Sequence, residues 1–319
     1  STQILIKEAI TRGVPVEEID PQDNFIGLGK GDKKTYVKQA TKTELDNYIT
    51  VLVMENKVVT KKIMAQRGIP VPAGEEFSSY DEAARRIGPY VGKKVVIKPK
   101  STNYGLGICI FDQGGSEKDL LEAVEIAFEY DKTVIIEEFI PGQEYRFLVI
   151  GGEVVAVLKR VPANVTGDGI HTITQLVDEK NRHPFRGYGY TAPLKKIELD
   201  EQTELYLKQQ ELKFGDVLPD GKTVYLRGNS NISTGGDSID MTDEMPDFFK
   251  RVAVEAAASV KAVFCGVDII IEDYRDEKSP FGIIELNFNP STDMHAYPYQ
   301  GTERRTGEFI LRALGLIEN

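Results

Sequence analysis

The sequence is short of basic residues and contains no long apolar run. Its 39 Lys and Arg residues face 50 Asp and Glu residues, which leaves a formal net charge of −11. Nucleic acid and anionic membrane surfaces both need a clustered basic surface, so we expect neither as a partner. No uncharged stretch approaches the roughly 20 residues of a membrane span. The first residues, STQILIKEAI, lack the layout of a signal peptide.

Cysteine is scarce as well. Cys109 and Cys265 both lie in apolar, strand-like stretches, which favours buried thiols over a disulfide and predicts a cytoplasmic location. There is no internal repeat, no low-complexity tract and no Ser-His-Asp arrangement for nucleophilic catalysis. The chain begins at Ser1 rather than at Met, which is consistent with a fragment of a longer protein.

The composition that remains is that of a globular protein with mixed secondary structure. Of its 319 residues, 41% are hydrophobic and 28% are charged, and this length corresponds to about two domains. Helical and strand periodicities alternate, which indicates an α/β or α+β fold. We expect helices capped by Asn56, by Ser79 with Glu82, and by Ser116 with Asp119.

Longer segments can be assigned from their local pattern. The runs YRFLVI and EVVAVLKRV flank Gly151-Gly152 and predict a two-residue β-hairpin, because this pair tolerates positive φ. The runs CGVDIII and FGIIELNF predict a final hairpin. Residues 162–191 are rich in Gly, Asn, His and Arg and predict a long functional loop with a short helix inside. We place a soft boundary between two subdomains near residue 130.

The stretch VVIKPKSTNYGLGICI, residues 95–110, predicts a strand, a flexible loop and a second strand. It lacks the third glycine and the following helix of a dinucleotide fingerprint. Lys98 ends the first strand, and the backbone N–H groups from Ser101 to Gly107 are free to wrap an anion, as in a phosphate clamp. The alternative for Lys98 is an ordinary surface lysine. For Lys57 taken alone, a surface lysine is the better interpretation.

Acidic and amide side chains near the C-terminus suggest a metal site. In the run IIELNFNP, Glu285 and Asn287 are two residues apart, so in a strand they point to the same face. Asp268, in the preceding strand, could join them. Two carboxylates and an amide oxygen suit Mg²⁺. A solvated strand face is the alternative, but the apolar residues around Glu285 make an unpaired charge costly there.

Two more polar segments are candidates for binding. In EEFIPGQE, a strand runs into a Pro-Gly turn that could offer its backbone to a purine and a carboxylate to ribose hydroxyls; an exposed acidic turn is the alternative. The run RGNSNISTGGDS suits a polar, peptide-like substrate or a phosphate; a turn-rich connection is the alternative. The loop NVTGDGIHT, residues 164–172, is a lid candidate, and His171 in it is better explained as a satisfied loop histidine than as a general base.

In their order along residues 51–295, these motifs resemble the ATP-grasp superfamily of carboxylate–amine ligases. ENKVVTKKIMAQRGIPVP is similar to the first-lysine helix, VVIKPKSTNYGLGI to the second lysine and phosphate loop, and IIEEFIPGQEYR to the adenine hinge. The resemblance implies an α+β, ATP-grasp fold in which two α/β subdomains with mainly antiparallel sheets enclose ATP. We expect a reduced N-terminal segment at 1–50, a small subdomain at 51–130 and a large subdomain at 131–319 with the metal site and substrate loops.

The resemblance also implies roles for individual residues. The residues expected to bind ATP are Lys57, Lys98, Ser101, Tyr104, Gly105, Gly107, Glu137, Glu138, Phe139, Ile140 and Glu144, with the lysines on phosphates and Glu144 on ribose. Mg²⁺, or Mn²⁺ in its place, is expected at Asp268, Glu285 and Asn287. The residues expected to contact substrate are Arg146, Asn229, Asn231, Ser233 and Thr234. Catalysis is assigned to Lys98, Arg160 and Arg227; many superfamily members have an arginine at the position of Gly266, and Arg160 or Arg227 would replace its charge.

Further runs are similar to the C-terminal glutathione synthetase module of the bifunctional glutamate–cysteine ligase/glutathione synthetase family, among them RVPANVTGDGIHTI and NFNPSTDMHAYPYQG. This narrower resemblance implies an ATP-dependent ligase that joins γ-glutamylcysteine to glycine through an acyl phosphate. It also implies a covalently linked glutamate–cysteine ligase module in the parent protein, and we expect a homodimer. Two alternatives stay open: a cyanophycin-synthetase-like ligase with other amino-acid or peptide substrates, and an ATP-binding module without turnover.

Overall fold

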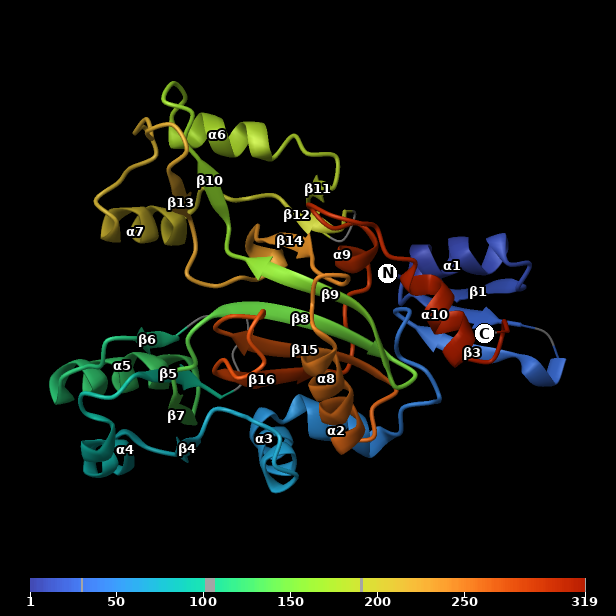
Figure 1. Cartoon of the computed structure of the whole chain (residues 1–319), viewed down its shortest axis with the longest axis horizontal. Helices are drawn as coiled ribbons and strands as arrows, with labels where there is room; N and C mark the ends of the chain where they lie inside the picture. Colours follow the sequence, from blue (N-terminus) through green and yellow to red (C-terminus); the bar gives the residue numbers. More distant parts are fainter. Residues whose placement is uncertain (30, 101–106, 190–191, 319) are drawn as a thin grey trace.

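The computed structural model describes the chain except residues 30, 101–106, 190–191 and 319. Its centre is a five-stranded antiparallel sheet in the order β14-β9-β8-β15-β16 (Figure 1). The strands are β8 (Gln143–Ile150), β9 (Glu153–Val161), β14 (Asp237–Asp240), β15 (Phe264–Ile271) and β16 (Phe281–Asn287). Gly151 and Gly152, at φ of 62° and 87°, form the turn between β8 and β9. Both predicted hairpins are therefore confirmed.

The two faces of this sheet differ because side chains alternate along each strand. One face packs its apolar residues, Phe147 and Val267 among them, against α8 (Asp247–Ser259) and against α2 (Tyr48–Glu55) and α3 (Lys57–Gln66). The other face carries charged side chains such as Arg146 and Asp268 along part of its length, and at one end it packs apolar residues such as Leu148 and Phe264 into a second core. The fold thus separates a core face from a face on which chemistry can take place.

A second, four-stranded sheet has the order β4-β7-β5-β6. Its strands are β4 (Gly74–Phe77), β5 (Val95–Pro99), β6 (Cys109–Phe111) and β7 (Val134–Glu138), covered by α4 (Tyr80–Arg86) and α5 (Glu117–Tyr130), with η2 (Gly88–Tyr90) between them. β7, which follows the soft boundary predicted near residue 130, pairs with β4 and β5 in the small sheet. α2 and α3, which fall within the predicted range 51–130 of the small subdomain, pack on the large sheet. The division into subdomains stays a prediction.

The predicted helix caps mostly form. Asn56 accepts from the N–H of Val59 at the start of α3, and Ser116 with Asp119 makes a complete capping box on α5. The Ser79 side chain accepts from the N–H of Glu82, but the Glu82 carboxylate accepts from Ser78 instead of Ser79. Both cysteines are free thiols; Cys265 is buried and Cys109 is half-buried.

The N-terminal segment is a small lobe of its own. It comprises α1 (Thr2–Thr11) and an antiparallel sheet of β1 (Val16–Asp20), β2 (Phe25–Leu28) and β3 (Thr35–Lys38), with η1 (Gly31–Lys33) before β3. The last helix, α10 (Thr306–Ala313), packs on α1, so the two ends of the chain lie together (Figure 1). The core of this lobe is continuous with the ends of β8, β9 and β15.

A satellite layer lies beyond β9 in the upper part of Figure 1. It contains β10 (Asn164–Thr166), α6 (Ile173–Lys180), β11 (Arg186–Gly187), β12 (Leu194–Lys195), α7 (Glu201–Gln209) and β13 (Thr223–Tyr225) around its own small core; η3 (Ile232–Thr234) and α9 (Asp293–Ala296) connect it to the sheet. The short helix predicted inside residues 162–191 is therefore confirmed as α6. In the part of the chain that the structure describes, no helix has both the length and the apolar character to cross a membrane.

Candidate active site

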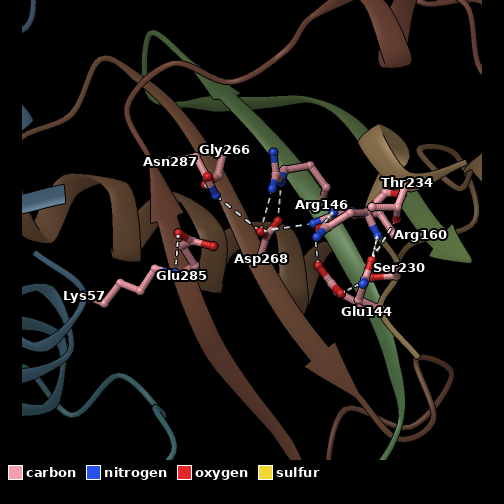
Figure 2. Close-up of polar contacts among 12 residues, drawn as sticks. Lys57, Glu144, Arg146, Arg160, Ser230, Thr234, Gly266, Asp268, Glu285 and Asn287 are labelled. Atoms are coloured by element: carbon pink, nitrogen blue, oxygen red, sulfur yellow. Dashed lines mark hydrogen bonds and ion pairs between the residues drawn. The ribbon is translucent and has the colours of Figure 1, made fainter. Parts of the chain in front are cut away.

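The polar face of the large sheet carries a network of charged side chains around Asp268 (Figure 2). The strand register places Arg146 opposite Asp268 on one side and Glu285 opposite it on the other. The guanidinium of Arg146 donates to both carboxylate oxygens of Asp268, with Nη2 at 2.6 Å from Oδ2. Arg160 Nη1 lies 3.4 Å from the same oxygen. Because Asp268 is only 1% exposed, these two arginines neutralise a charge that water hardly reaches.

Arg146 fills the space next to Gly266. Burial opposes the charged form of Arg146, but the contact with Asp268 outweighs burial and raises the pKa of the guanidinium. A Cβ built on Gly266 would lie 3.1 Å from Cδ of Arg146. We expected the charge at this position to come from Arg160 or Arg227. The structure instead brings Arg146, which was assigned to substrate, into contact with Gly266.

Glu285 and Asn287 complete an oxygen-rich set beside Asp268. Asn287 Nδ2 donates to Asp268 Oδ2 at 3.2 Å, and Glu285, with a side chain 32% exposed, pairs with Lys57 Nζ at 3.4 Å. Among the described residues, no three His, Cys, Asp or Glu side chains could hold a metal by themselves. Mg²⁺ does not need such a cage, because it takes one or two carboxylates and completes its shell with water and phosphate oxygens.

The donor set suits such an ion, although Arg146 shares one of its members. Both oxygens of Asp268 accept hydrogen bonds from Arg146, and each carboxylate oxygen has a second lone pair, so a cation at Asp268 would share the carboxylate with the guanidinium or displace one of its hydrogen bonds. Glu285 is accessible as it stands, and Asn287 can present its amide oxygen by turning about its terminal bond. The three residues predicted to bind the metal therefore lie together, with Arg146 in competition for one of them.

Glu137, on the central strand β7 of the small sheet, connects two lysines. Lys98, on β5, donates to one carboxylate oxygen and Lys61, on α3, donates to the other. Burial opposes ionisation of Glu137, but the attraction of Lys98 and Lys61 outweighs it and lowers the pKa of the carboxyl. For Lys61 burial is the largest effect, and it lowers the pKa of the ammonium to about 8. The predicted adenine contact of Glu137 stays a prediction.

The segment after β7 has most of its N–H groups engaged. The N–H of Glu138 donates to the carbonyl of Ala73 at 2.8 Å, and that of Phe139 to the carbonyl of Lys94 at 3.1 Å. Within the described chain, the N–H of Ile140 meets no backbone acceptor, which leaves it as the donor on this hinge for a purine edge. The contacts predicted between this hinge and adenine, including that of Ile140, stay predictions.

Of the predicted phosphate loop, the structure describes the flanking residues and Gly107 but not residues 101–106. Ser101, Tyr104 and Gly105, which were predicted to bind ATP, lie outside the described residues. Gly107 has φ of 70°, and a Cβ on it would lie 2.8 Å from the side chains of Pro99 and Tyr130. Glycine is therefore required there both by the backbone and by the packing.

Glu144 and Arg160 continue the network toward the satellite layer (Figure 2). Glu144 accepts from Arg160 Nη1 at 2.5 Å and from the hydroxyl of Ser230. Arg160 Nη2 donates to Asn231 Oδ1 at 2.6 Å. The predicted contact of Glu144 with ribose stays a prediction, and the carboxylate of Glu144 accepts from Arg160 and Ser230.

The loop at residues 227–234 is only partly joined to this network. Thr234 donates to Asn229 Oδ1 at 2.9 Å, which shapes the loop, and Ser233 is exposed. Arg227 pairs with Asp200 Oδ2 at 2.6 Å rather than with the acids on the sheet. Burial opposes ionisation of Asp200, but the hydrogen bond from Arg227 outweighs it and lowers the pKa of the carboxyl to about 2. The predicted catalytic role of Arg227 thus gains no support from its contacts.

A cleft of about 340 Å³ lies between α2, α3 and the end of β16. Its lining includes Lys57, Glu285 and Asn287, which were predicted for phosphate and metal. It also includes Lys100, which pairs with Glu76 at 2.8 Å and was not predicted. Lys57, two of the three predicted metal ligands (Glu285 and Asn287) and the further cation Lys100 therefore border one cavity.

Lys61 and Ser230 are the other site residues that sequence reasoning missed. Lys61 follows Lys57 by four residues, so both lie on one face of α3, and this spacing was a usable signal. Ser230 stands in the run that was selected for substrate, but its hydroxyl meets Glu144 only through the fold. No local pattern connects residues that are 86 positions apart.

Two family models match the chain, and both describe ATP-grasp domains. Residues 1–49 match an ATP-grasp-like domain, and residues 54–173 match a RimK-like ATP-grasp domain. The chain belongs to the ATP-grasp superfamily, whose ligases use ATP and divalent metal ions. The mainly antiparallel fold predicted for it is confirmed.

More specific similarity is to proteins of glutathione biosynthesis. The chain is 53% identical to the glutathione biosynthesis bifunctional protein GshAB of Clostridium perfringens over 98% of this chain and 41% of that protein. It is 52% identical to GshAB of Listeria innocua over 98% of this chain and 40% of that protein. A crystal structure of a bifunctional glutathione synthetase from Pasteurella multocida superposes with a TM-score of 0.79 at 47% identity, over 98% of this chain and 44% of that one. The chain thus spans about two fifths of the length of these curated relatives.

Proposed function

We propose that the chain is an ATP-dependent C–N ligase that joins γ-glutamylcysteine to glycine and releases glutathione, ADP and phosphate. The observation that carries the proposal is the 53% identity to a glutathione biosynthesis protein over 98% of the chain. The arrangement of cations and acids on the sheet supports the same chemistry. We further propose that the reaction takes place in the cytoplasm, with Mg²⁺ as the ion and Mn²⁺ able to replace it.

The chemistry begins with two anions that must be brought together. An oxygen of the donor carboxylate attacks the γ-phosphorus of ATP, the bond to the bridging oxygen breaks, and ADP leaves. Such a transfer is mainly a matter of position and charge compensation. Lys57 and Lys98 would compensate the phosphates, and Arg146 would turn from Asp268 to the transferring group.

The second half of the reaction forms the peptide bond. The amine of glycine attacks the acyl carbon, phosphate leaves with its bonding electron pair, and the amine loses a proton. Arg160, which donates to Glu144 and Asn231, would stabilise the oxyanion of the tetrahedral intermediate. A divalent ion at Asp268, Glu285 and Asn287 would supply charge neutralisation at the phosphates.

The longer relatives suggest what accompanies this chain. They are bifunctional, and the chain covers 41% of the relative from Clostridium perfringens. We propose that the parent protein carries a covalently linked glutamate–cysteine ligase module, which would supply γ-glutamylcysteine. We also propose that the chain forms a homodimer, which sedimentation measurements would test.

The function is tested by measuring ADP release with γ-glutamylcysteine and each of glycine, aspartate and arginine, with the product identified by mass spectrometry. We expect ADP and glutathione only with glycine. The Lys98→Ala variant should lose at least about 100-fold in turnover, because a charge-assisted contact to phosphate is lost. Lys62→Ala, which removes an exposed lysine next to Lys61, is the matched control. Turnover with aspartate or arginine instead of glycine would replace the proposal with a cyanophycin-type ligase, and silence with every acceptor would replace it with a non-catalytic ATP-binding module.

A further inference from the structure

A turn of the N-terminal lobe, residues 38–42, contacts the end of β16 at the rim of the cleft. Thr41 Oγ1 donates to Asn289 Oδ1 at 3.0 Å, and Asn289 Nδ2 donates to Gln39 Oε1 at 3.2 Å. Lys42 Nζ lies 5.5 Å from the ring centroid of Phe288. Phe288 and Asn289 both line the 340 Å³ cleft. The lobe therefore brings Lys42 against Phe288, which lines the cleft together with Glu285 and Asn287 of the metal set.

The backbone of this turn is strained. Gln39 and Ala40 have φ of 54° and 69°, although neither is glycine. Two successive side-chain-bearing residues in the left-handed region cost about 1–2 kcal/mol each. Such strain persists where the surroundings impose it, and it gathers at binding sites. Here it directs the chain so that Thr41 is fully buried against Asn289 while the Lys42 side chain reaches Phe288.

Lys42 also differs from the other lysines around the cleft in the chemical type of its hydrogen-bond partner. The lysines that pair with a carboxylate are Lys57, Lys61, Lys98 and Lys100. Lys42 Nζ instead donates to the neutral amide oxygen of Gln39 at 2.7 Å. Throughout the described ranges, no Asp or Glu lies within ion-pair distance of this half-buried ammonium. A partly desolvated cation fixed in this way favours an anionic ligand.

We propose that Lys42, positioned by Gln39 and Asn289, binds a non-reacting carboxylate of the donor substrate. This inference rests on the proposed function, in which the donor is γ-glutamylcysteine. The donor carries carboxylates at both ends, separated by roughly two residue lengths, about 7 Å. Asn289, which contacts Gln39 beside Lys42, follows Asn287 of the metal set by two residues at the end of β16. Glycine has a single carbon between its amine and its carboxylate, too short to reach from the reacting centre to Lys42.

The test compares Lys42→Met with Lys42→Arg in the full chain. Met keeps an unbranched side chain over Phe288 but removes the ammonium, with its charge and its hydrogen bond to Gln39, whereas Arg retains a cationic donor. We expect Lys42→Met to raise KM for γ-glutamylcysteine about 10–100-fold, which corresponds to losing one charge-assisted hydrogen bond. KM for ATP and for glycine should change less than about twofold, and Lys42→Arg should restore most of the affinity for γ-glutamylcysteine. Calorimetric binding of γ-glutamylcysteine with a non-hydrolysable ATP analogue gives the same comparison without turnover.

The matched control is Lys38→Met. Lys38 lies on the same lobe with its ammonium 5.5 Å from the ring centroid of Phe25, but it pairs with Asp23. The Lys38→Met variant should leave KM for γ-glutamylcysteine, for ATP and for glycine unchanged. A second variant, Asn289→Asp, places an anion beside the proposed subsite and should weaken γ-glutamylcysteine binding while leaving ATP binding intact.

The outcomes separate this inference from the proposed function. If the wild type converts γ-glutamylcysteine and glycine but Lys42→Met binds γ-glutamylcysteine normally, the inference fails and the function stands. If Lys42→Met raised KM only for ATP, Lys42 would be a phosphate ligand, and if it raised KM only for glycine, Lys42 would bind the acceptor. Either result would overturn the inference as well. If the wild type uses a different donor, the function fails, and Lys42 is judged by KM for that donor. A chain without turnover on any donor contradicts both.

Discussion

Lys61 is the site residue whose charge changes closest to neutral pH. Its pKa is lowered to about 8, chiefly by burial, so the ammonium is charged below that pH and neutral above it. An unperturbed lysine stays charged until about pH 10.4. The charge that balances Glu137 on the side of α3 is therefore lost within an accessible pH range.

We predict that affinity for Mg·ADP falls several-fold between pH 7 and pH 9. The loss of the Lys61 charge leaves Lys98 as the single cation on Glu137, and the site becomes less attractive to an anionic nucleotide. Lys61→Arg should flatten the profile, because arginine stays charged throughout this range. Lys62→Arg, one position along α3, should behave as the wild type. Isothermal calorimetry checks the prediction, and a flat wild-type profile would contradict it.

The pair of Arg146 and Asp268 leads to a prediction about stability. Arg146→Met removes the bidentate partner of a carboxylate that is 1% exposed and leaves it with Arg160 at 3.4 Å. Because breaking a buried pair exposes the cost of an uncompensated charge, we expect a loss of about 3 kcal/mol in the free energy of unfolding. Asp268→Asn added to Arg146→Met should recover part of that loss in urea titrations. Strictly additive losses would show that the two charges do not interact.

At the scale of elements, the sequence predicted the helix caps and the hairpin turn, which form through contacts between residues close together in the chain. Asn56 and Ser116 cap helices through residues three positions away, and Gly151-Gly152 closes a hairpin between adjacent strands. These features need only short-range hydrogen bonds and φ preferences. The sequence therefore predicted their positions.

The features that the sequence did not predict depend on distant pairing. The placement of β7 in the small sheet requires partners far earlier in the chain, from Pro99 opposite Val134 to Gly74 opposite Glu137. The contact between Arg146 and Gly266 requires the register of β8 against β15. Resemblance to a known superfamily named the metal set, but it could not show that an arginine of this chain competes for Asp268.

The hinge between the two sheets depends on one glycine. Gly142 has φ of 126°, and a Cβ there would overlap the carbonyl of Ile271 at the end of β15. We expect Gly142→Ala to destabilise the protein by about 3 kcal/mol, from backbone strain and overlap together. It should also weaken nucleotide binding, because the segment from Phe139 to Pro141 must shift.

Gly152→Ala is the matched control for the hinge. Gly152 also has positive φ, at 87°, but a Cβ on it meets no atom within 4 Å. Its cost should be about 1 kcal/mol from strain alone, with nucleotide binding unchanged. Urea unfolding and ADP titration measure both effects. Equal losses in the two variants would mean that overlap with β15 does not matter.

At the scale of the whole molecule, the cores divide the chain differently from the sequence-based domains. The N-terminal lobe, α10 and the ends of β8, β9 and β15 share one core, whereas the small sheet has its own. A shared core unfolds as a unit, and separate cores can open separately. The turn that carries Lys42 is therefore held in place by the large sheet and by the last helix.

This division predicts a pattern of hydrogen exchange. Leu311, on α10, is fully buried in the shared core, and Leu311→Ala should cost about 3 kcal/mol. We expect faster exchange both in β2 and β3 and at the joined ends of β8 and β9, with β4 to β7 unchanged. Phe77→Ala, equally buried in the core of the small sheet, should show the reverse pattern. If exchange in Leu311→Ala became faster only in the N-terminal lobe, the lobe would be an independent domain. The position of Lys42 relative to Asn289 would then depend only on the hydrogen bonds that Asn289 makes with Thr41 and Gln39.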